Sequence, residues 1–402
     1  MSSTDFDIIT IGGGLGGASL AKVMAEHGAQ VLVLESETKF KDRVRGEAMV
    51  SWGVNEAKEL GIYSNLRDAG GWDVEFLEVS LEAGKPVRRQ LRSTTNPSEP
   101  RFNFYHPDIQ ESLLQAASDA GAVIQRGARV RHLRLGDSHV VVATVAGVEK
   151  EFTARLVVGA DGRYSRSRGW GGFQVSENPE STFCAGLLFQ GMTAPDDTTH
   201  NFRIFEKSLN ALLFPQRSGM VRAYLCYPMA WGEQLSADKD IRRFINWSVE
   251  AGTPKGYFEG AVPAGPLASF KSASTWVEHP YRDGVALIGD AAGATDPMWG
   301  QGLSLTLRDV RVLRDRLLGE RDWAKSGHAY AEEHDRYFTV CNTVQAWHER
   351  LLVETGQEAN ALRARVFQLW QLDPTRRLDT FASGPDHPID ETVRRRFFGE
   401  DW

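Results

Sequence analysis

The sequence predicts an α/β protein in which a Rossmann-type nucleotide-binding domain is interleaved with an antiparallel-sheet domain and followed by a C-terminal helical region. Three observations predict this architecture. Residues 5–35 have the pattern of a strand, a glycine turn, a helix and a second strand. Apolar runs that end in an acidic residue recur at 156–161 and 285–290, and residues 182–227 form short strands separated by turn residues.

The first strand and its turn form a candidate phosphate-binding site. Residues 8–11 are an apolar run without polar alternation, as expected of a parallel strand that is buried on both faces. Gly12, Gly14 and Gly17 have the spacing G-x-G-x-x-G, which allows a tight turn, close approach of a pyrophosphate, and close packing of helix on strand. The helix that follows ends at Gly28, and its N-terminus favours an anion.

Glu35 indicates which nucleotide binds. It ends the second strand, residues 31–34, where a carboxylate can hydrogen-bond both hydroxyls of an adenosine ribose but would repel a 2′-phosphate. The nucleotide is therefore expected to be FAD or NAD rather than NADP. A purely structural glycine turn is the alternative, and it leaves Glu35 without a role. The basic segment 38–45 neutralises the cofactor diphosphate, receives a second nucleotide, or is a solvated loop.

Composition excludes several classes of function. The 402 residues are too many for a single core, and the formal net charge of -7 argues against a nucleic-acid partner. Cys184, Cys226 and Cys341 lie far apart without a C-x-x-C pair, which favours free thiols over a disulfide framework or a metal site. No signal peptide and no transmembrane segment is evident, so we expect a cytoplasmic protein.

The remaining elements follow from periodicity and from turn residues. The helix at His106 is expected to be capped by Asp108, and residues 268–276 are expected to form one strand that returns to the first domain. The other predicted elements are a helix at 54–60, a hairpin at 74–92, strands at 122–125, 129–135, 139–145, 156–160, 183–189, 211–214, 221–227 and 285–288, helices at 241–251 and 303–319, and a mostly helical stretch at 324–370.

The order of these predicted elements divides the chain into six parts. Nucleotide-binding segments are expected at 1–75, 101–180 and 277–320, and substrate-domain segments at 76–100, a hairpin, and 181–276, mostly antiparallel sheet. Residues 321–402 are expected to form C-terminal helices and an arm over the surface. The arginines at 394–396 are interpreted as a solvated face of that arm.

Three motifs together carry a resemblance to a known family. They are the segment from Gly12 to Glu35, the pattern Asp-Gly-x-x-Ser-x-x-Arg at 161–168, and Gly289-Asp290 after a buried strand. In this combination residues 5–320 resemble the FAD-dependent class A aromatic monooxygenases, the p-hydroxybenzoate hydroxylase-like flavoproteins. The resemblance implies that the nucleotide-binding domain holds FAD.

The resemblance also implies which residues meet FAD. Glu35 would hold the adenosine ribose, Val130 the adenine, and Asp290 the ribityl chain, with Arg43 or Arg45 near the diphosphate. An arginine common in the family near His106 is absent, and Gln110 is expected to replace it. The full implied set is Gly12, Gly14, Leu15, Gly16, Gly17, Glu35, Ser36, Arg43, Arg45, Gln110, Val130, Asp161, Gly289, Asp290, Pro297, Gly300, Gly302 and Leu303.

The chemistry implied by the resemblance is hydroxylation of an aromatic or polycyclic small molecule. NAD(P)H would reduce FAD, and O₂ would then form a flavin C4a-hydroperoxide that oxygenates the substrate. A second G-x-G-x-x-G is absent, so NAD(P)H either docks transiently or a partner flavin reductase supplies electrons. The substrate cavity is expected between the sheet at 182–276 and the flavin, with walls from Phe214, Pro215, Met298 and Trp299. No catalytic base is assigned, although His106, His200 and His279 are available.

Three other functions stay open at this point. A flavin halogenase is disfavoured because its Trp-x-Trp-x-Ile-Pro signature is absent. A geranylgeranyl-reductase-like flavoprotein is favoured by Arg45-Gly46-Glu47, which resembles those enzymes and the halogenases more than the hydroxylases. A non-enzymatic escort of prenylated proteins would need no flavin, and the intact Gly289-Asp290 segment argues against it.

Overall fold

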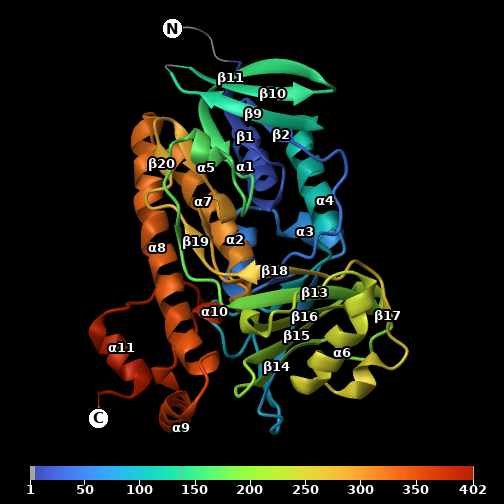
Figure 1. Ribbon diagram of the computed structural model, residues 1–402. Coiled ribbons are helices and arrows are strands. Elements are labelled where there is room, and N and C mark those ends of the chain that lie inside the picture. The colour runs from blue at the N-terminus through green and yellow to red at the C-terminus, as the bar shows by residue number, and fades with distance from the viewer. Residues whose placement is uncertain (1–4, 137, 402) are drawn as a thin grey trace.

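The computed structural model describes residues 5–136 and 138–401, so residues 1–4 and 402 of the predicted parts lie outside it. The described residues form two eight-stranded sheets at opposite ends of the molecule, with helices between and beside them (Figure 1). This mixed α/β architecture with C-terminal helices confirms the predicted fold class. The boundaries expected for the six parts stay a prediction.

The first sheet is built around β1, with the order β20-β21-β11-β1-β2-β8. β1 pairs in parallel with β2, through Ile8 and Val31, and with β11, through Ile8 and Leu156. The three predicted buried strands are therefore neighbours or near neighbours in one sheet. Its strands are β1 (Phe6–Ile11), β2 (Val31–Glu35), β8 (Val123–Arg126), β9 (Ala128–Arg134), β10 (His139–Val145), β11 (Val148–Gly159), β20 (Tyr281–Arg282) and β21 (Val285–Leu287).

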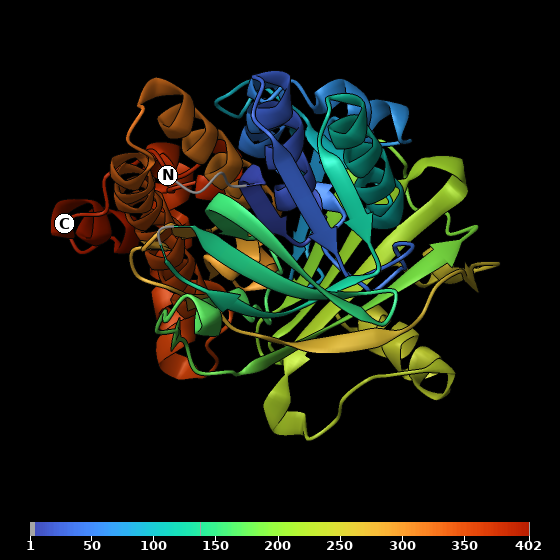
Figure 2. The same cartoon turned by 90° about the horizontal axis from the view of Figure 1, so that it is seen from above.

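Both faces of β1 are covered, which explains why its sequence shows no polar alternation. Ile8 packs into a core formed with helices α1, α4, α7 and α8, whereas Ile9 and Ile11 pack against the antiparallel strands β9 and β10. Figure 2 shows α1 and α4 on one side of this sheet and β9 and β10 on the other. The predicted antiparallel pair at 129–135 and 139–145 is confirmed as β9 and β10. The helices are α1 (Leu15–Glu26), α2 (Ser51–Glu59), α3 (Tyr63–Asp68), α4 (His106–Asp119), α5 (Ser167–Trp170), α6 (Ile241–Glu250), α7 (Gly302–Gly319), α8 (Trp323–Leu352), α9 (Gln357–Leu372), α10 (Thr380–Ser383) and α11 (Glu391–Phe398).

The second sheet has the order β17-β13-β16-β15-β14-β5-β6, with β18 also pairing with β13. Residues 217–219 form the turn that joins β15 to β16, and the hairpin predicted at 74–92 pairs as β5 and β6. Strand β14, at 198–204, was not predicted. The strands are β5 (Phe76–Leu81), β6 (Val87–Gln90), β13 (Thr182–Gln190), β14 (Thr198–Ile204), β15 (Leu209–Gln216), β16 (Met220–Pro228), β17 (Val262–Pro263) and β18 (Ala268–Ser272).

The single strand predicted at 268–276 is wrong. The chain leaves the second sheet after β18, and residues 275–276 form β19 (Thr275–Trp276), which pairs with β12 (Ser176–Glu177) and β22 (Gly293–Ala294) in a separate sheet. This crossing carries the chain from one large sheet back toward the other. A further small sheet contains β3 (Ala48–Met49), β4 (Trp72–Val74) and β7 (Arg101–Asn103).

The C-terminal region is packed more closely than a surface arm. α8 runs alongside both sheets in Figure 1, and Phe397 and Phe398 of α11 are buried against Trp347 of α8. Arg394 and Arg396 pair with acidic side chains of this same region. Among the residues described, no helix is both long enough and apolar enough to span a membrane.

Candidate functional site

The glycine turn after β1 leaves the N-terminus of α1 open to an anion. Gly12 has φ +104°, and a Cβ at this position would lie 2.5 Å from the carbonyl oxygen of Ala160. A Cβ on Gly17 would overlap the carbonyl oxygen of Gly12. α1 begins at Leu15 with Gly14 as its N-cap, and neither a capping side chain nor an acidic residue occupies its first turn. These uncapped N–H groups fit a dinucleotide diphosphate.

Glu35 lies beside this turn, as the spacing of the motif predicts. Its side chain is 6% exposed, and Oε2 accepts a hydrogen bond of 2.7 Å from the Gly13 N–H. Oε1 accepts from the Glu37 N–H at 2.7 Å and from the Ser36 hydroxyl at 3.2 Å. Gln110 reaches the same turn from α4, since a Cβ on Gly14 would lie 3.5 Å from its Nε2. The structure thus brings Glu35, Ser36 and Gln110 to the glycine turn.

Asp161 acts mainly on its own loop. Its carboxylate accepts from the Ser165 hydroxyl at 2.6 Å, the Arg166 N–H at 2.8 Å and the Ser167 N–H at 3.1 Å. This loop places Arg168, which donates to the carbonyl oxygens of Asp290 at 2.5 Å and Ala291 at 2.8 Å. The motif at 161–168 therefore ties the end of β11 to the segment that follows β21.

The charges of Asp290 and Arg45 each shift the pKa of the other group. Burial raises the pKa of Asp290, while the charges of Arg163, Arg45 and Arg168 act to lower it. Burial and the Arg43 charge lower the pKa of Arg45, and the charges of Asp290 and Glu35 oppose that shift. The Arg45 side chain is nevertheless exposed by surface area. It is therefore surrounded by protein atoms but still accessible, as a group that contacts a bound molecule must be.

The N-terminus of α7 lies next to the same two segments. A Cβ on Gly302 would lie 3.6 Å from Oδ1 of Asp290, and one on Gly46 would lie 3.8 Å from Leu303. Gln301 is the N-cap of α7 and provides no side-chain cap, so this helix end is also free to face a polar group. Gly300 has φ +67°, which a side chain would strain.

Two predicted cofactor residues lie at the edge of this group. Arg43 is half-exposed and ion-paired with Glu37, so its charge is shared with that carboxylate. Val130 is buried with the apolar side chains beneath β9 and β10. Val130 could meet a ligand only through its backbone or a rearranged side chain, whereas the Arg43 side chain is accessible.

An apolar cluster faces this region from the second sheet. We define it by the buried residues Val44, Cys184, Leu212, Tyr224, Cys226, Met298 and Trp299. Phe214 packs against it, so three of the four predicted pocket residues come together. Pro215 lies outside the cluster, because successive strand residues point to opposite faces of the sheet. Its carbonyl oxygen accepts from Trp72 Nε1 at 3.2 Å and Asn103 Nδ2 at 2.8 Å.

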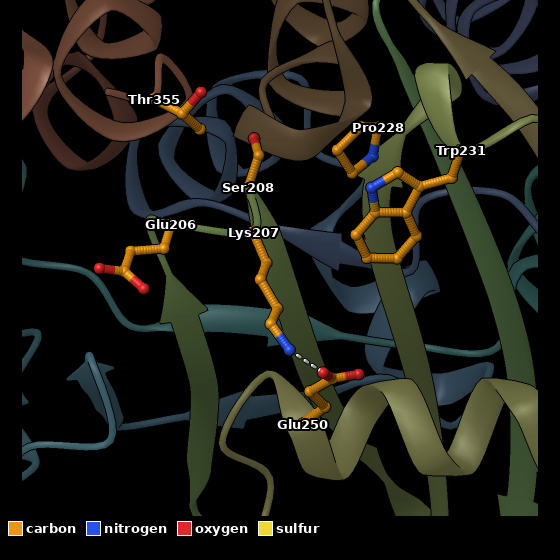
Figure 3. A pocket seen from close by; sticks show the side chains of 7 residues that line it. All are labelled: Glu206, Lys207, Ser208, Pro228, Trp231, Glu250 and Thr355. Atoms are coloured by element: carbon orange, nitrogen blue, oxygen red, sulfur yellow. Dashed lines mark hydrogen bonds and ion pairs between the residues drawn. The ribbon is translucent and has the colours of Figure 1, made fainter. Parts of the chain in front are cut away.

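One cavity among the described residues adjoins the apolar cluster, and another lies apart from the predicted site. A cavity of about 180 Å³ is lined by Met298 together with Asp296, Glu349 and serine and threonine side chains from the start of β13 and the end of β18. A larger cavity of about 370 Å³ lies beside Trp231 and is spanned by the ion pair of Lys207 with Glu250 (Figure 3). None of its lining residues belongs to the predicted site.

Two of the candidate histidines, His106 and His200, are poor candidates for a catalytic base. Burial and the Arg45 charge lower the pKa of His106 to about 3, so its ring is neutral, and Nδ1 lies 3.1 Å from the Gly46 carbonyl oxygen as a donor. Burial likewise lowers the pKa of His200, which lies in β14 beside Glu78. A ring that is so reluctant to take a proton is a poor general base near neutral pH.

Sequence reasoning missed the partners of Glu47. Asp108 was expected to cap α4, but it lies inside the first turn, and Tyr105 is the N-cap. The His106 N–H instead donates to Glu47 Oε1 at 3.0 Å. Glu47 also pairs with Arg222 of β16. These residues are separated by 59 and 175 positions, so no local pattern could have joined them.

Comparison with known proteins identifies the family of this chain and several relatives. The family model described as the FAD binding domain matches residues 5–351. The chain is 26% identical to 6-methylpretetramide 4-monooxygenase of Streptomyces rimosus, over 97% of this chain and 94% of that one. It is 27% identical to digeranylgeranylglycerophospholipid reductase 2 of Methanopyrus kandleri, over 77% and 76%.

A solved structure has the same fold. The crystal structure of p-nitrophenol 4-monooxygenase PnpA from Pseudomonas putida DLL-E4 superimposes with a TM-score of 0.78. The two chains are 17% identical, and the match covers 98% of this chain and 97% of that one.

Proposed function

Because the chain belongs to the FAD binding domain family and is a flavin-dependent monooxygenase, we propose that it hydroxylates an aromatic or polycyclic small molecule. The apolar cluster carries this proposal. It joins strands of the second sheet to Met298 and Trp299, which directly follow Pro297 and precede the α7 N-terminus. A flat apolar substrate held there would lie between the sheet and the proposed flavin site.

The proposed cofactor site uses the groups at the ends of the parallel strands. The uncapped α1 N-terminus takes the diphosphate, Glu35 the adenosine ribose and Asp290 the ribityl chain. Arg45 adds positive charge between Glu35 and Asp290, and the α7 N-terminus faces the pyrimidine edge of the ring. Leu15, Gly16, Gly289, Gly300 and Leu303 contribute backbone rather than side-chain groups.

FAD supplies the redox chemistry, which is electron transfer from NAD(P)H and activation of O₂. The chain's own task is to hold the substrate next to the ring and to exclude water from it. Met298, Trp299 and Phe214 do both, since they are apolar and largely buried. We propose no catalytic base, because His106 and His200 have lowered pKa values.

The test is to purify the protein and measure flavin content, then NAD(P)H oxidation with and without phenols and polycyclic quinols. We expect a yellow protein whose NAD(P)H oxidation accelerates with one substrate class and yields a product carrying one oxygen atom from O₂. A protein that cannot take up FAD would overturn the proposal. Supplying a separate flavin reductase distinguishes direct NAD(P)H docking from a partner enzyme.

Reduction of an isoprenoid alkene is the second candidate. Arg45-Gly46-Glu47 resembles the reductases, and the Methanopyrus relative is named as one. Alkene reduction without O₂ would favour it, whereas hydroxylation requires O₂. A halogenase would instead need halide for product formation. A cytoplasmic location is part of the main proposal and is consistent with the free thiols of Cys184, Cys226 and Cys341.

A further inference from the structure

A buried ion pair joins the loop at 42–47 to the second sheet. Glu47 is 1% exposed, and the Arg222 side chain is completely buried. Arg222 Nε donates to Glu47 Oε2 at 2.8 Å, and Arg222 Nη2 donates to Glu47 Oε1 at 3.2 Å and to Asp42 Oδ2 at 2.8 Å. One arginine of β16 therefore holds both ends of this loop.

Glu47 connects that arginine to two further elements. Oε1 accepts from the His106 N–H at the start of α4, and Oε2 accepts from the Gln216 side chain of β15. His106 in turn donates through Nδ1 to the Gly46 carbonyl oxygen, and the Tyr224 hydroxyl donates to the Arg45 carbonyl oxygen. Each residue from Arg45 to Glu47 is thus attached to α4 or to the second sheet.

A gain in stability does not by itself explain why the fold buries an ion pair. Removing two charges from water costs so much that well-packed apolar residues of similar volume often stabilise a core equally well. Burial raises the pKa of Glu47 even though the Arg222 charge and the hydrogen bonds from Arg222 and His106 act to lower it. The direction of the shift reflects the free-energy cost of removing the carboxylate from water. An apolar pair could fill the volume, but it would leave the His106 N–H and the Gln216 side-chain amide without the acceptor that Glu47 provides.

We infer that Arg222 and Glu47 are positioning residues that hold Arg45 and Gly46 in the geometry that binds FAD. The inference rests on the proposed cofactor site. Arg45 lies in the fields of Glu35 and Asp290, and Gly46 lies against Leu303 of α7, so a shift of this loop alters the cofactor surface. β15 and β16 also carry Phe214 and Tyr224 at the apolar cluster, so the pair links the substrate wall to the cofactor loop.

The experiment uses Glu47→Gln, which keeps size and one acceptor oxygen but removes the charge, and Arg222→Met. FAD affinity is measured by quenching of flavin fluorescence on titration, and stability by urea unfolding of the FAD-free proteins. If one loop conformation in ten remains competent, FAD binding weakens about tenfold. Should Arg222→Met fail to fold, Glu47→Gln carries the test.

Glu56→Gln is the matched control. Glu56 is also buried and accepts from Arg308 Nε and Arg311 Nε at 2.5 Å each, between α2 and α7. We expect it to lose stability comparably while keeping wild-type FAD affinity. If the Glu47 and Arg222 variants weaken FAD binding no more than this control, the pair is merely structural and the inference is wrong. A wild-type protein that takes up no FAD overturns the proposed function, and the inference with it.

Discussion

Asp309 of α7 offers a test of how burial shapes the site. Its carboxylate is 1% exposed, and Oδ2 accepts a hydrogen bond of 2.6 Å from the N–H of Gly289, the residue before Asp290. The Tyr337 hydroxyl donates to Oδ1. Burial is the largest influence on this group and raises its pKa from 3.8 to about 6, although the His334 charge and both hydrogen bonds act in the opposite direction. The substitution to examine is Asp309→Asn.

The sign of the expected effect follows from proton linkage. The pKa of Asp309 is higher in the folded state than in the unfolded state. Protonated Asp309 therefore contributes its full share of the free energy of unfolding below pH 3.8, and this contribution is lost as the pH rises through about 6. A shift of about two pKa units corresponds to about 3 kcal/mol in total, of which about 1 kcal/mol falls between about pH 5 and about pH 7. Asparagine has the same shape and no charge to bury, so the variant lacks this loss.

The assay is urea unfolding of FAD-free wild type and Asp309→Asn at several pH values in this interval. FAD is omitted because a ligand that binds only the folded state adds its own stabilisation. The other acidic groups titrate in both proteins, so the difference between their free energies of unfolding reports Asp309 together with its coupling to Asp290. We expect the variant to gain about 1 kcal/mol relative to wild type from about pH 5 to about pH 7. A difference that stays constant, or that moves the other way, would refute the reasoning.

Three further substitutions test the site directly. Gly17→Ala places a Cβ on the Gly12 carbonyl oxygen, so we expect a loss of about 1–3 kcal/mol in urea unfolding together with loss of FAD uptake. Arg45→Met removes the charge near Asp290, and FAD titration should show binding weakened about tenfold or more. Trp299→Ala opens the apolar cluster, so the KM of the substrate that stimulates NAD(P)H oxidation should rise about tenfold, while FAD affinity stays at the wild-type value. Unchanged values in these measurements would contradict the respective roles.

The core of the first sheet could be predicted because its information is local. An apolar run at 8–11, three spaced glycines and Glu35 fall within about thirty residues, and each reports the same unit. The structure places Glu35 beside the turn through a hydrogen bond to Gly13. The hairpins were found for the same reason, since a turn and its two flanking strands are adjacent in sequence.

Elements that depend on distant partners could not be predicted. β14 reads TTHNFRI, a polar run, and it is a strand because β5, more than a hundred residues earlier, pairs with it in parallel. The chain at 268–276 contains no Gly or Pro that would mark a break, but its two ends pair with different sheets. Glu47 was noticed in the sequence only as part of an unusual tripeptide. Its role depends on Arg222, whose position on β16 gives no local sign of a buried charge.

The three acidic residues at the ends of strands make different contacts. Glu35 faces the glycine turn with one oxygen on the Gly13 N–H, a donor that a bound ribose would have to share or displace. Asp161 already accepts from three donors of its own loop, and that loop also places Arg168 against the Asp290 carbonyl oxygen. Asp290 lies partly buried near Arg163, Arg45 and Arg168, and no donor among the described residues forms a hydrogen bond to its carboxylate. The position of an acidic residue at the end of a strand therefore predicts that the three carboxylates lie near one another. The number of donors around each carboxylate determines how many of its acceptor positions stay open for a ligand.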